Sequence, residues 1–367
     1  MGPYGRARLG GSRAGRVSLL LLLLMLVCSA SALAGCRTVA NDLEDSVTLV
    51  IPTYEGSGQI AHPTVIDFSV EYGLEQWGGH RYWMSGSPYP GANDRYENPC
   101  VWVSDDGVSW QVPQGIPQPL VETPADYARH ARYNSDPTIV YNPHDDLIEL
   151  YYRESLGRDD EATILIHRLD IRARTTNTTG EVSFDLEQRS LRTPSFTRDD
   201  SILSPSVVID DDGMHYMLAV SNAVNGTYGV IVMRGELDGL AYGDPIVCEP
   251  SAEQAIIGPE GLPPVRPWHL SAKRDRVTDQ IVMLINGQAY DGKRRIRNLY
   301  WAQTSLDYLS EMTYPQPDAL MEGSNTWQPY RSTFVLAADE YATPLRLWVN
   351  WYSTHRPQVW SIDYLER

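Results

Sequence analysis

Short stretches in which polar and apolar residues alternate recur along most of the chain, and many are rich in valine, isoleucine, tyrosine and tryptophan. This composition with a period of two residues is typical of β-strands. No long segment has the 3.6-residue period of an amphipathic helix, so we expect very little helix. The predicted strands are 62–68, 82–85, 100–104, 138–142, 147–153, 163–171, 182–185, 207–210, 214–220, 228–235, 269–273, 280–286, 298–304, 333–337, 345–352 and 358–364.

A proline at the start of a strand segment repeats five times. These prolines are Pro63, Pro137, Pro205, Pro267 and Pro329, with spacings of 74, 68, 62 and 62 residues. Proline is tolerated at the first position of a strand, where its missing N–H costs least. A repeat of this length that holds four strands is typical of a β-propeller. We therefore predict an all-β fold over 48–367, a five-bladed β-propeller of four-stranded antiparallel blades. Each blade opens with its innermost strand, and a strand near 47–51 is expected to complete the last blade.

The first 35 residues have the features of an export signal. Four arginines precede an apolar run over 17–27 that is too short to be a good membrane span. Leu33-Ala34-Gly35-Cys36 follows and resembles the lipobox of bacterial lipoproteins, in which the signal is cut before an acylated cysteine. We predict a lipoprotein signal peptide over 1–35, a lipidated Cys36 and a polar tether over 36–47. The alternative is an ordinary signal peptide cut after Ala32-Leu33-Ala34.

The chain is acidic, with 30 basic and 47 acidic residues and a net charge of −17. Without residues 1–35 it keeps 26 basic and 47 acidic residues, a net charge of −21. Such a charge repels nucleic acids and anionic glycans as main ligands, although a local basic pocket can override it. We therefore expect no nucleic acid partner, and an exported monomer that contacts the cell-envelope membrane through its lipid anchor only. Cys100 and Cys248 fall in different predicted blades, so we expect no disulfide between them.

The geometry of a propeller allows a site to be predicted from the repeat. Residues just before each inner strand gather around the axis on one face, and loops between second and third strands reach the same face. The first set gives His62, Asp136, Ser204, Arg266, Trp268, His269 and Arg331. The second set gives Asp94, Arg95, Glu97, Arg153, Glu154, Asn222 and Trp351. Each residue alone is compatible with a structural role, but together they suit a poly- or oligosaccharide, because aromatic rings stack on a sugar while polar groups bind its hydroxyls.

Five blades with Asp136-Pro137 at the start of blade two resemble the five-bladed glycoside hydrolases of families 32, 43 and 68. In those families an Asp opens blade one as base or nucleophile. An Asp before Pro opens blade two and orients the substrate, and a Glu opens blade three as the acid. Only Asp136 matches by type and position, because His62 and Ser204 stand at the other two positions. The resemblance implies a carbohydrate-active propeller whose acids come in part from elsewhere.

Glycoside hydrolysis usually needs two carboxyl groups about 5–5.5 Å apart for retention or 6.5–9.5 Å apart for inversion. We therefore predict that Asp136 works with Glu97 or Glu154 across the axial pocket. One of the pair needs a raised pKa to act as the acid. The alternative is a non-catalytic glycan-binding or scaffold propeller that has lost the acid positions.

Two other chemistries have weaker support from the sequence. A metal-dependent enzyme would need ligands, and the acids with His62 can bind Ca²⁺ structurally, but no local metal-loop spacing supports this. We therefore predict no metal and no cofactor. Ser204, His62 and Asp136 have the composition of a Ser-His-Asp hydrolase, yet the chain lacks a Gly-x-Ser-x-Gly elbow.

Overall fold

The computed structural model describes residues 46–157, 163–175, 182–197, 202–222, 228–250, 266–290, 295–314, 319–336 and 344–366. The chain divides into two compact units, Met1–Asn41 and Asp42–Arg367, and all described residues belong to the second. The predicted signal peptide, the lipidated Cys36 and nearly all of the tether lie outside the described residues. Within the described part of the chain, no helix has the length and apolar character needed to cross a bilayer.

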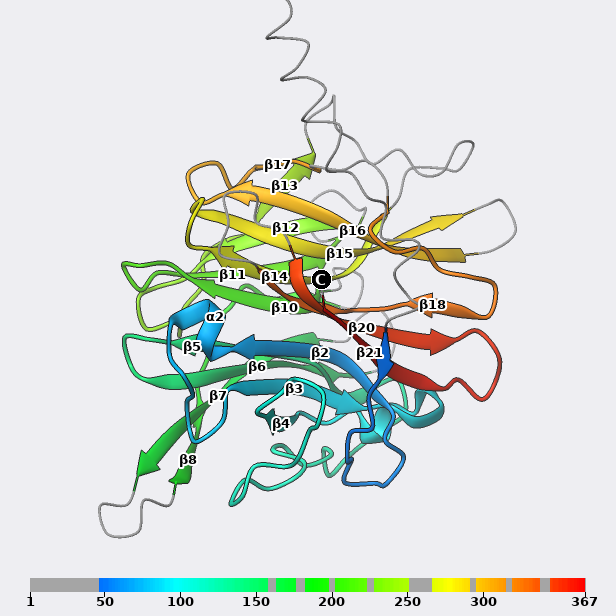
Figure 1. The fold of residues 1–367 in the computed structure, drawn as a ribbon. Coiled ribbons are helices and arrows are strands. Elements are labelled where there is room, and N and C mark those ends of the chain that lie inside the picture. Colours follow the sequence, from blue (N-terminus) through cyan, green and yellow to red (C-terminus); the bar gives the residue numbers. More distant parts are fainter. Residues whose placement is uncertain are drawn as a thin grey trace, which may run out of the picture. The chain divides into compact units, whose positions relative to one another are not determined.

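Five mainly antiparallel sheets follow one another along the chain as the blades of a propeller (Figure 1). Blade one holds β2 (Ile60–Asp67), β3 (Tyr82–Pro88) and β4 (Cys100–Ser104). Blade two holds β5 (Arg132–Asn142), β6 (Leu147–Leu156), β7 (Thr163–Thr175), β8 (Val182–Arg189) and the short β9 (Phe196–Thr197). Blade three holds β10 (Ile202–Ile209), β11 (His215–Ser221), β12 (Gly229–Arg234), β13 (Ile246–Pro250) and, parallel to β13, β17 (Glu311–Met312).

Blade four holds β14 (Arg266–Asp275), β15 (Gln280–Tyr290) and β16 (Arg295–Ser305). Blade five holds β18 (Trp327–Pro329), β19 (Thr333–Leu336), β20 (Pro344–Ser353), β21 (Trp360–Glu366) and β1 (Val47–Thr48). The helical elements of the described residues are short: α2 (Phe68–Tyr72) and the 3₁₀ turns η2 (Pro90–Ala92) and η3 (Asp94–Tyr96). The prediction of an all-β five-bladed propeller is confirmed.

The ring closes by pairing the two ends of the propeller domain. Val47 of β1 lies opposite Tyr364 of β21, so the N-terminal strand completes blade five as predicted (Figure 1). The strand count differs between blades. Blades one and four have three continuous strands in the described residues, and isolated bridges such as Val103–Gln111 and Gln303–Thr313 continue their outer edges.

Apolar side chains fill the spaces between neighbouring blades. One core cluster joins blades one and two and includes Trp83 and Leu150, and another joins blades three and four and includes Leu218 and Met283. Because both faces of an inner sheet are covered, β2, β3, β10 and β11 are buried along their whole length. Cys100 and Cys248 are buried and unpaired, as expected. The inner strands β2, β5, β10 and β14 contact one another in this order, and β19 contacts β2.

Candidate functional site

The inner strands of the first three blades contain the same irregularity. In β2 the two residues His62 and Pro63 lie opposite a single residue of β3, because Ala61 pairs with Ser87 and Thr64 pairs with Ser85. Asp136-Pro137 in β5 and Ser204-Pro205 in β10 do the same. A β-bulge of this kind turns a side chain out of the regular alternation, and bulges are enriched next to active sites. The repeated proline therefore marks a bulge, and the residue before it is turned aside.

Backbone strain gathers at these bulges. Seven non-glycine residues in the described part of the chain have positive φ, and three of them are His62 (58°), Asp136 (52°) and Ser204 (52°). Left-handed conformations cost an L-residue roughly 1–2 kcal/mol each. They persist where the surrounding structure enforces them, and they cluster at functional sites. Three equivalent strained positions around one axis indicate a built site.

Three of the predicted residues bring ligand atoms together at the axis. His62 Nδ1 lies 2.8 Å from Asp136 Oδ1, and His269 Nδ1 lies 3.7 Å from the same oxygen. All three side chains are buried, and their ligand atoms lie within 4.8 Å of one another. His62 Nδ1 and Asp136 Oδ1 face each other as an ion pair, and neither atom makes a hydrogen bond outside this cluster of three side chains among the described residues. We call His62, Asp136 and His269 the axial group.

The second polar atom of each member of the axial group is held by a neighbour. His62 Nε2 lies 3.0 Å from Glu97 Oε1, and Arg153 Nη1 donates to Asp136 Oδ2 over 2.8 Å. His269 Nε2 lies 2.7 Å from the Tyr330 hydroxyl. Metal-ligating histidines usually bond their other ring nitrogen to an oxygen, and ligating carboxylates are themselves hydrogen-bonded. The axial group has this pattern of outer partners.

Ser204 stands at the third bulge and contacts the axial group from the side. Its Oγ lies 2.6 Å from His269 Nδ1, the ring nitrogen that faces Asp136. The hydroxyl can rotate to donate to that nitrogen or to accept from it. Ser204 thus helps to place the His269 ring, and it contributes to the site through this histidine.

Burial and charge shift the protonation of these groups in different directions. Burial opposes ionisation of Asp136, but the charges of His62 and Arg153 hold its pKa well below the usual value. Burial raises the pKa of Glu97 to about 7, although His62 partly offsets this. Burial also lowers the pKa of His269 well below its usual value, so this imidazole stays neutral and can donate a lone pair. At His62, burial is outweighed by the two carboxylates, which raise the pKa.

A cavity of about 260 Å³ lies over the axial group, and we call it the axial cavity. Its wall is polar and aromatic. It is lined by His62, Tyr89, Glu97, His130, Tyr133, Ser135, Asp136, Arg153, Ser155, Ile164, Leu203, Tyr228, Trp268, His269 and Tyr330. The rings of Trp268, Tyr228 and Tyr330 offer faces on which a sugar can stack, and the polar groups can bind its hydroxyls.

The axial group passes a first test as a cation site. Two ligands that share one ion at roughly 2.1 Å lie about 3.4 Å apart at the tetrahedral angle that zinc prefers. The observed separations of 2.8 and 3.7 Å bracket this value. Imidazole and carboxylate are a donor set that suits zinc and other first-row metals. Such an ion would bind His62 Nδ1 and Asp136 Oδ1, which contact each other and make no hydrogen bond outside the axial group among the described residues.

The structure brings six of the predicted site residues to the axial cavity: His62, Glu97, Asp136, Arg153, Trp268 and His269. Glu154 lies elsewhere, because successive residues of β6 point to opposite faces and Arg153 takes the face toward Asp136. The Glu154 carboxylate instead contacts His167 and Arg132. Asp94 is buried behind the cavity and accepts from Tyr127 and from the backbone of His130.

The remaining predicted residues do not line the axial cavity. Arg331 is fully buried and donates to the carbonyls of Leu270, Pro137 and Pro205, which ties the inner strands of three blades together. Arg95 lies over the Tyr127 ring, and Arg266 is exposed at the start of β14. Asn222 follows β11, and Trp351 is buried in β20 opposite Pro329.

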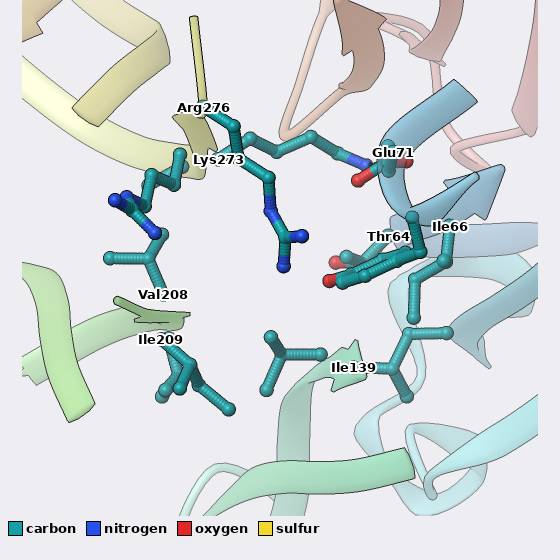
Figure 2. A pocket seen from close by; sticks show the side chains of 13 residues that line it. Thr64, Ile66, Glu71, Ile139, Val208, Ile209, Lys273 and Arg276 are labelled. Atoms are coloured by element: carbon teal, nitrogen blue, oxygen red, sulfur yellow. Dashed lines mark hydrogen bonds and ion pairs between the residues drawn. The ribbon is translucent and has the colours of Figure 1, made fainter. Parts of the chain in front are cut away.

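A smaller cavity of about 40 Å³ lies further along the inner strands (Figure 2). Aliphatic residues that follow the bulges, such as Ile66, Ile139 and Val208, form much of its wall. Its charged groups include Lys273 and Glu71, whose Nζ and Oε1 atoms are 2.5 Å apart. Lys273 and Glu71 pair with each other, and Arg276 lies over the Tyr72 ring. This cavity is far smaller than the axial cavity, to which we therefore assign the chemistry.

No family model matches the chain. A curated relative, the A type blood N-acetyl-α-D-galactosamine deacetylase of Flavonifractor plautii, is 26% identical over 310 residues. The match covers 75% of this chain and 37% of that protein, so the chain spans little more than a third of the relative's length. A crystal structure of an N-acetylgalactosamine deacetylase from F. plautii, in complex with blood group B trisaccharide, superimposes with a TM-score of 0.66 at 20% identity. It covers 87% of this chain and 94% of that chain.

A family 43 β-1,3-galactosidase superimposes with a TM-score of 0.50 at 12% identity, over 88% of this chain and 60% of that chain. The fold is that of the five-bladed glycoside hydrolase propellers. The resemblance inferred from the repeats is therefore confirmed for the architecture. The proteins that share it here are carbohydrate-active enzymes of more than one reaction type, so the reaction has to be argued from the site.

Local motif spacing does not predict that His62, Asp136 and His269 converge. The three residues come from three blades and are separated by 74 and 133 residues, so no short ligand motif connects them. The repeated proline was the available signal for His62 and Asp136. His130 and Tyr133, which also line the axial cavity, precede the bulge of β5 and carry no sequence signal of their own.

Proposed function

We propose that this propeller is a carbohydrate-processing enzyme that removes the acetyl group from an N-acetylated sugar and depends on a divalent metal ion. The observation that carries the proposal is the convergence of His62, Asp136 and His269 in the axial cavity, where Asp136 Oδ1 faces both histidines and makes no hydrogen bond outside the axial group. The 26% identity to a sugar deacetylase supports the same reaction.

The chain's own residues have distinct tasks in this proposal. His62, Asp136 and His269 would hold the ion, while Glu97, Arg153 and Tyr330 fix their orientation. A bound divalent ion supplies Lewis acidity and lowers the pKa of a water molecule. Trp268 and Tyr228 would position the sugar ring. In the net reaction water adds to the acetyl carbonyl, the C–N bond breaks, and the nitrogen takes a proton to leave as an amine with acetate as co-product.

Hydrolysis of a glycosidic bond by Asp136 and Glu97 is a second candidate function. The pKa values favour it, because Glu97 is raised to about 7 while Asp136 is held low, and such separation is typical of acid–base pairs. The arrangement of the atoms opposes it. The His62 imidazole contacts one carboxylate through each ring nitrogen, so a scissile bond would have to displace the ring to lie between them. We therefore place deacetylation first.

One reaction mixture can separate the candidates. The protein is stripped with a chelator, reloaded with zinc or manganese, and incubated with N-acetylgalactosaminides and N-acetylglucosaminides, and acetate and new reducing ends are measured together. We expect acetate with an equal amount of free amine, lost on chelation and in Asp136→Asn. His144→Gln is the matched control, because this histidine is exposed and lies outside the cavity.

The other outcomes point elsewhere. Reducing ends without acetate would overturn deacetylation in favour of the glycosidase. Saccharide binding without either product would leave the non-catalytic glycan-binding propeller. Metal analysis gives a readout that does not depend on turnover, with one ion per chain expected in the wild type and none in Asp136→Asn.

We further propose that the chain is exported as a monomeric lipoprotein, acylated at Cys36 after removal of 1–35 and held at the cell envelope by this anchor alone. The order of arginines, apolar run and Leu-Ala-Gly-Cys supports this. Metabolic labelling with an alkynyl fatty acid should mark the wild type and leave Cys36→Ser unlabelled. Labelling of the variant would contradict the proposal.

A further inference from the structure

A second cavity of about 270 Å³ adjoins the axial cavity, and we call it the side cavity. The two share Tyr89 and His130 in their walls, so a ligand can extend from one into the other. The side cavity is also lined by Gly91, Ala92, Arg129, Arg356, Pro357 and Gln358. Each cavity is smaller than the ~300–1,000 Å³ typical of a drug-sized ligand, which fits one sugar unit in each.

Two arginines reach the side cavity from distant parts of the chain. Arg129 precedes β5, and Arg356 lies between β20 and β21. Among the described residues, neither guanidinium has a hydrogen-bond or ion-pair partner, and no Asp or Glu lines the cavity. Other arginines are paired, as Arg81 is with Asp67. In a chain with 47 acidic and 30 basic residues, two cations without an acid at one cavity are unusual.

The backbone of the side cavity is held in a strained form. Ala92 (φ 56°) and His130 (φ 57°) both adopt the left-handed conformation. The buried Asp94 enforces it at His130, because it accepts from the His130 backbone N–H over 2.5 Å and lies 2.9 Å from its ring Nδ1. The negative charge of Asp94 is therefore engaged behind His130. Of the seven left-handed non-glycine residues described, five line one of the two cavities or contact the axial group.

We propose that the side cavity binds an anionic group, a carboxylate or a sulfate ester, on the sugar next to the N-acetylated unit. Guanidinium groups bind planar and tetrahedral oxyanions through paired N–H donors. Tyr89 lies between the two sugar positions and offers its ring to either. This inference rests on the proposed function for the identity of the first sugar, and it makes the substrate class an acidic amino-sugar glycan.

The net charge of the chain sharpens this inference. A protein of charge −17 repels an acidic glycan at long range, so binding of one requires cations at the point of contact. Arg129 and Arg356 are exposed, so their attraction is screened by salt. A preference for the acidic ligand should therefore weaken as ionic strength rises.

The test compares two disaccharides that differ in one group. Glucuronosyl-N-acetylgalactosamine and glucosyl-N-acetylgalactosamine are titrated calorimetrically into chelator-treated protein at low salt, which prevents turnover if the proposed function holds. We expect at least tenfold tighter binding of the acidic disaccharide by the wild type, and equal binding of both by Arg129→Gln/Arg356→Gln. The charge-matched control is Arg174→Gln/Arg192→Gln, two exposed arginines outside both cavities, which should keep the preference.

Equal binding by the wild type, or a preference that survives in Arg129→Gln/Arg356→Gln, would overturn the inference. A third ligand, 6-O-sulfoglucosyl-N-acetylgalactosamine, carries its sulfate on the neighbouring sugar and separates the two anions, because the tighter of the acidic ligands identifies the group that is bound. Acetate release measured on the same disaccharides keeps the two proposals apart. Release at equal rates would preserve the function and remove the acidic subsite. An acidic preference without release would preserve the subsite and remove the reaction.

Discussion

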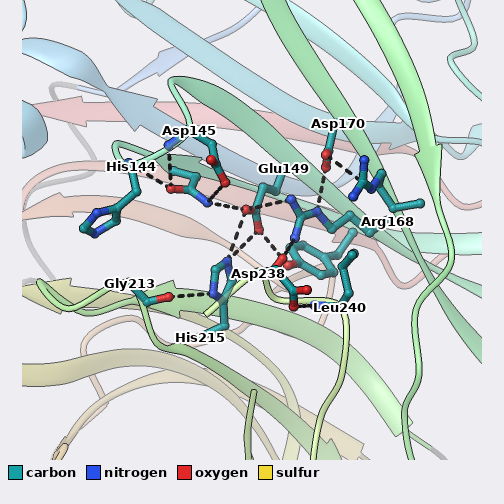
Figure 3. Close-up of polar contacts among 12 residues, drawn as sticks. His144, Asp145, Glu149, Arg168, Asp170, Gly213, His215, Asp238 and Leu240 are labelled. Carbon is teal, nitrogen blue, oxygen red and sulfur yellow. Dashed lines mark hydrogen bonds and ion pairs between the residues drawn. The ribbon is translucent and has the colours of Figure 1, made fainter. Parts of the chain in front are cut away.

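The protein contains two buried groups of histidine, carboxylate and arginine, and they differ in almost everything except composition. One is the axial group with Glu97 and Arg153. The other, which we call the interblade cluster, joins Glu149 and Arg168 of blade two to His215 of blade three (Figure 3). All three side chains of the interblade cluster are at most 3% exposed.

The interblade cluster is fully satisfied. The Glu149 carboxylate accepts from Asn142 over 2.8 Å and from the Tyr151 hydroxyl over 2.7 Å, in addition to His215 and Arg168. The other nitrogen of His215 lies 3.0 Å from the Gly213 carbonyl. No polar side-chain atom of Glu149, Arg168 or His215 lacks a hydrogen-bond partner in the described structure.

The axial group shows the opposite properties. Among the described residues, His62 Nδ1 and Asp136 Oδ1 make no hydrogen bond outside the axial group, two members of the group have left-handed backbones, and a cavity lies over it. Buried polar groups are nearly always paired, and exceptions call for an explanation. The comparison teaches that residue types and burial do not mark a site. Incomplete hydrogen bonding, backbone strain and an adjoining cavity together mark one.

The strongest test of this contrast is Asp136→Asn. The variant keeps an oxygen for Arg153 but loses the charge that faces both histidines, so we expect acetate release to fall by roughly 10³-fold, about 4 kcal/mol in transition-state stabilisation. The free energy of unfolding should fall as well, by up to about 3–5 kcal/mol, because Arg153 and His62 lose their buried anion. Steady-state kinetics and denaturant unfolding measure the two quantities. A stable variant with full activity would break the comparison.

A change in the interblade cluster should lower stability without lowering the activity of the folded protein. Glu149→Gln leaves Arg168 and His215 buried without their anion, and breaking a buried ion network costs about 3–5 kcal/mol. Guanidinium unfolding gives the loss, and kcat/KM of the folded variant should stay near that of the wild type. Glu236→Gln is the matched control, because Glu236 forms an exposed pair with Arg192 and should change stability by less than about 0.5 kcal/mol.

The stability contributed by Glu149 should also depend on pH. Burial opposes its ionisation, but His215, Arg168 and Tyr151 overcome this and lower its pKa below the ordinary value of 4.5. A lowered folded-state pKa adds stability above the ordinary value, and this stability is lost as pH falls through the folded-state pKa. The difference in unfolding free energy between wild type and Glu149→Gln should thus be constant near neutral pH and shrink in acid. A difference that is independent of pH would contradict this.

Glu97→Gln tests the outer partners of the axial group. Glu97 acts through His62 in the deacetylase proposal, so its loss should weaken metal affinity or activity by about 10–100-fold. Competition with a chelator measures the affinity directly, and a purely structural role would leave it unchanged. In the glycosidase alternative, Glu97 touches the substrate, and its loss should abolish release of reducing ends without any effect on metal binding.

The smallest expected effect concerns the strained backbone of the side cavity. Ala92→Gly removes one methyl group at φ 56°, where glycine is favoured, and should stabilise the protein by about 0.5–1 kcal/mol. Ala125→Gly is the control, because Ala125 is exposed with no positive φ and should be neutral or slightly destabilising. Thermal unfolding distinguishes the two. Destabilisation by Ala92→Gly would show that the left-handed turn carries no strain.

The repeated prolines predicted the fold because four of the five lie in an inner strand, Pro329 ends β18 shortly before β19, and the strands after them have clear apolar patterns. The prediction placed the blade-two inner strand at 138–142, whereas β5 begins at Arg132. The bulge at Asp136 and Pro137 lets the pairing of β5 with β6 continue past the proline. An interpretation that places the proline at the start of the strand therefore misses the residues of β5 before it. The edge strands of blades one and four were also less regular than predicted.

The site was predictable as a set of positions but not as a set of contacts. Arg153 and Glu154 are adjacent in the sequence, and only the register of β6 against β5 decides which one faces Asp136. The sequence also does not distinguish the roles of its arginines. Arg331 ties blades together, whereas Arg129 and Arg356 reach an open cavity. Such distinctions depend on three-dimensional placement, which short motifs do not encode.

The bulges at His62, Asp136 and Ser204 have a consequence for how this architecture diversifies. At each bulge the neighbouring ladder hydrogen bonds and the following proline set the backbone, while the preceding side chain is turned aside. The identity of that side chain can therefore change by a single codon without disturbing the ring. The backbone at these three positions stays the same while the side chain differs. This chain has His, Asp and Ser where the resemblance to glycoside hydrolases implies Asp, Asp and Glu. A change of reaction in this architecture then requires different side chains at the bulge positions and no change of fold.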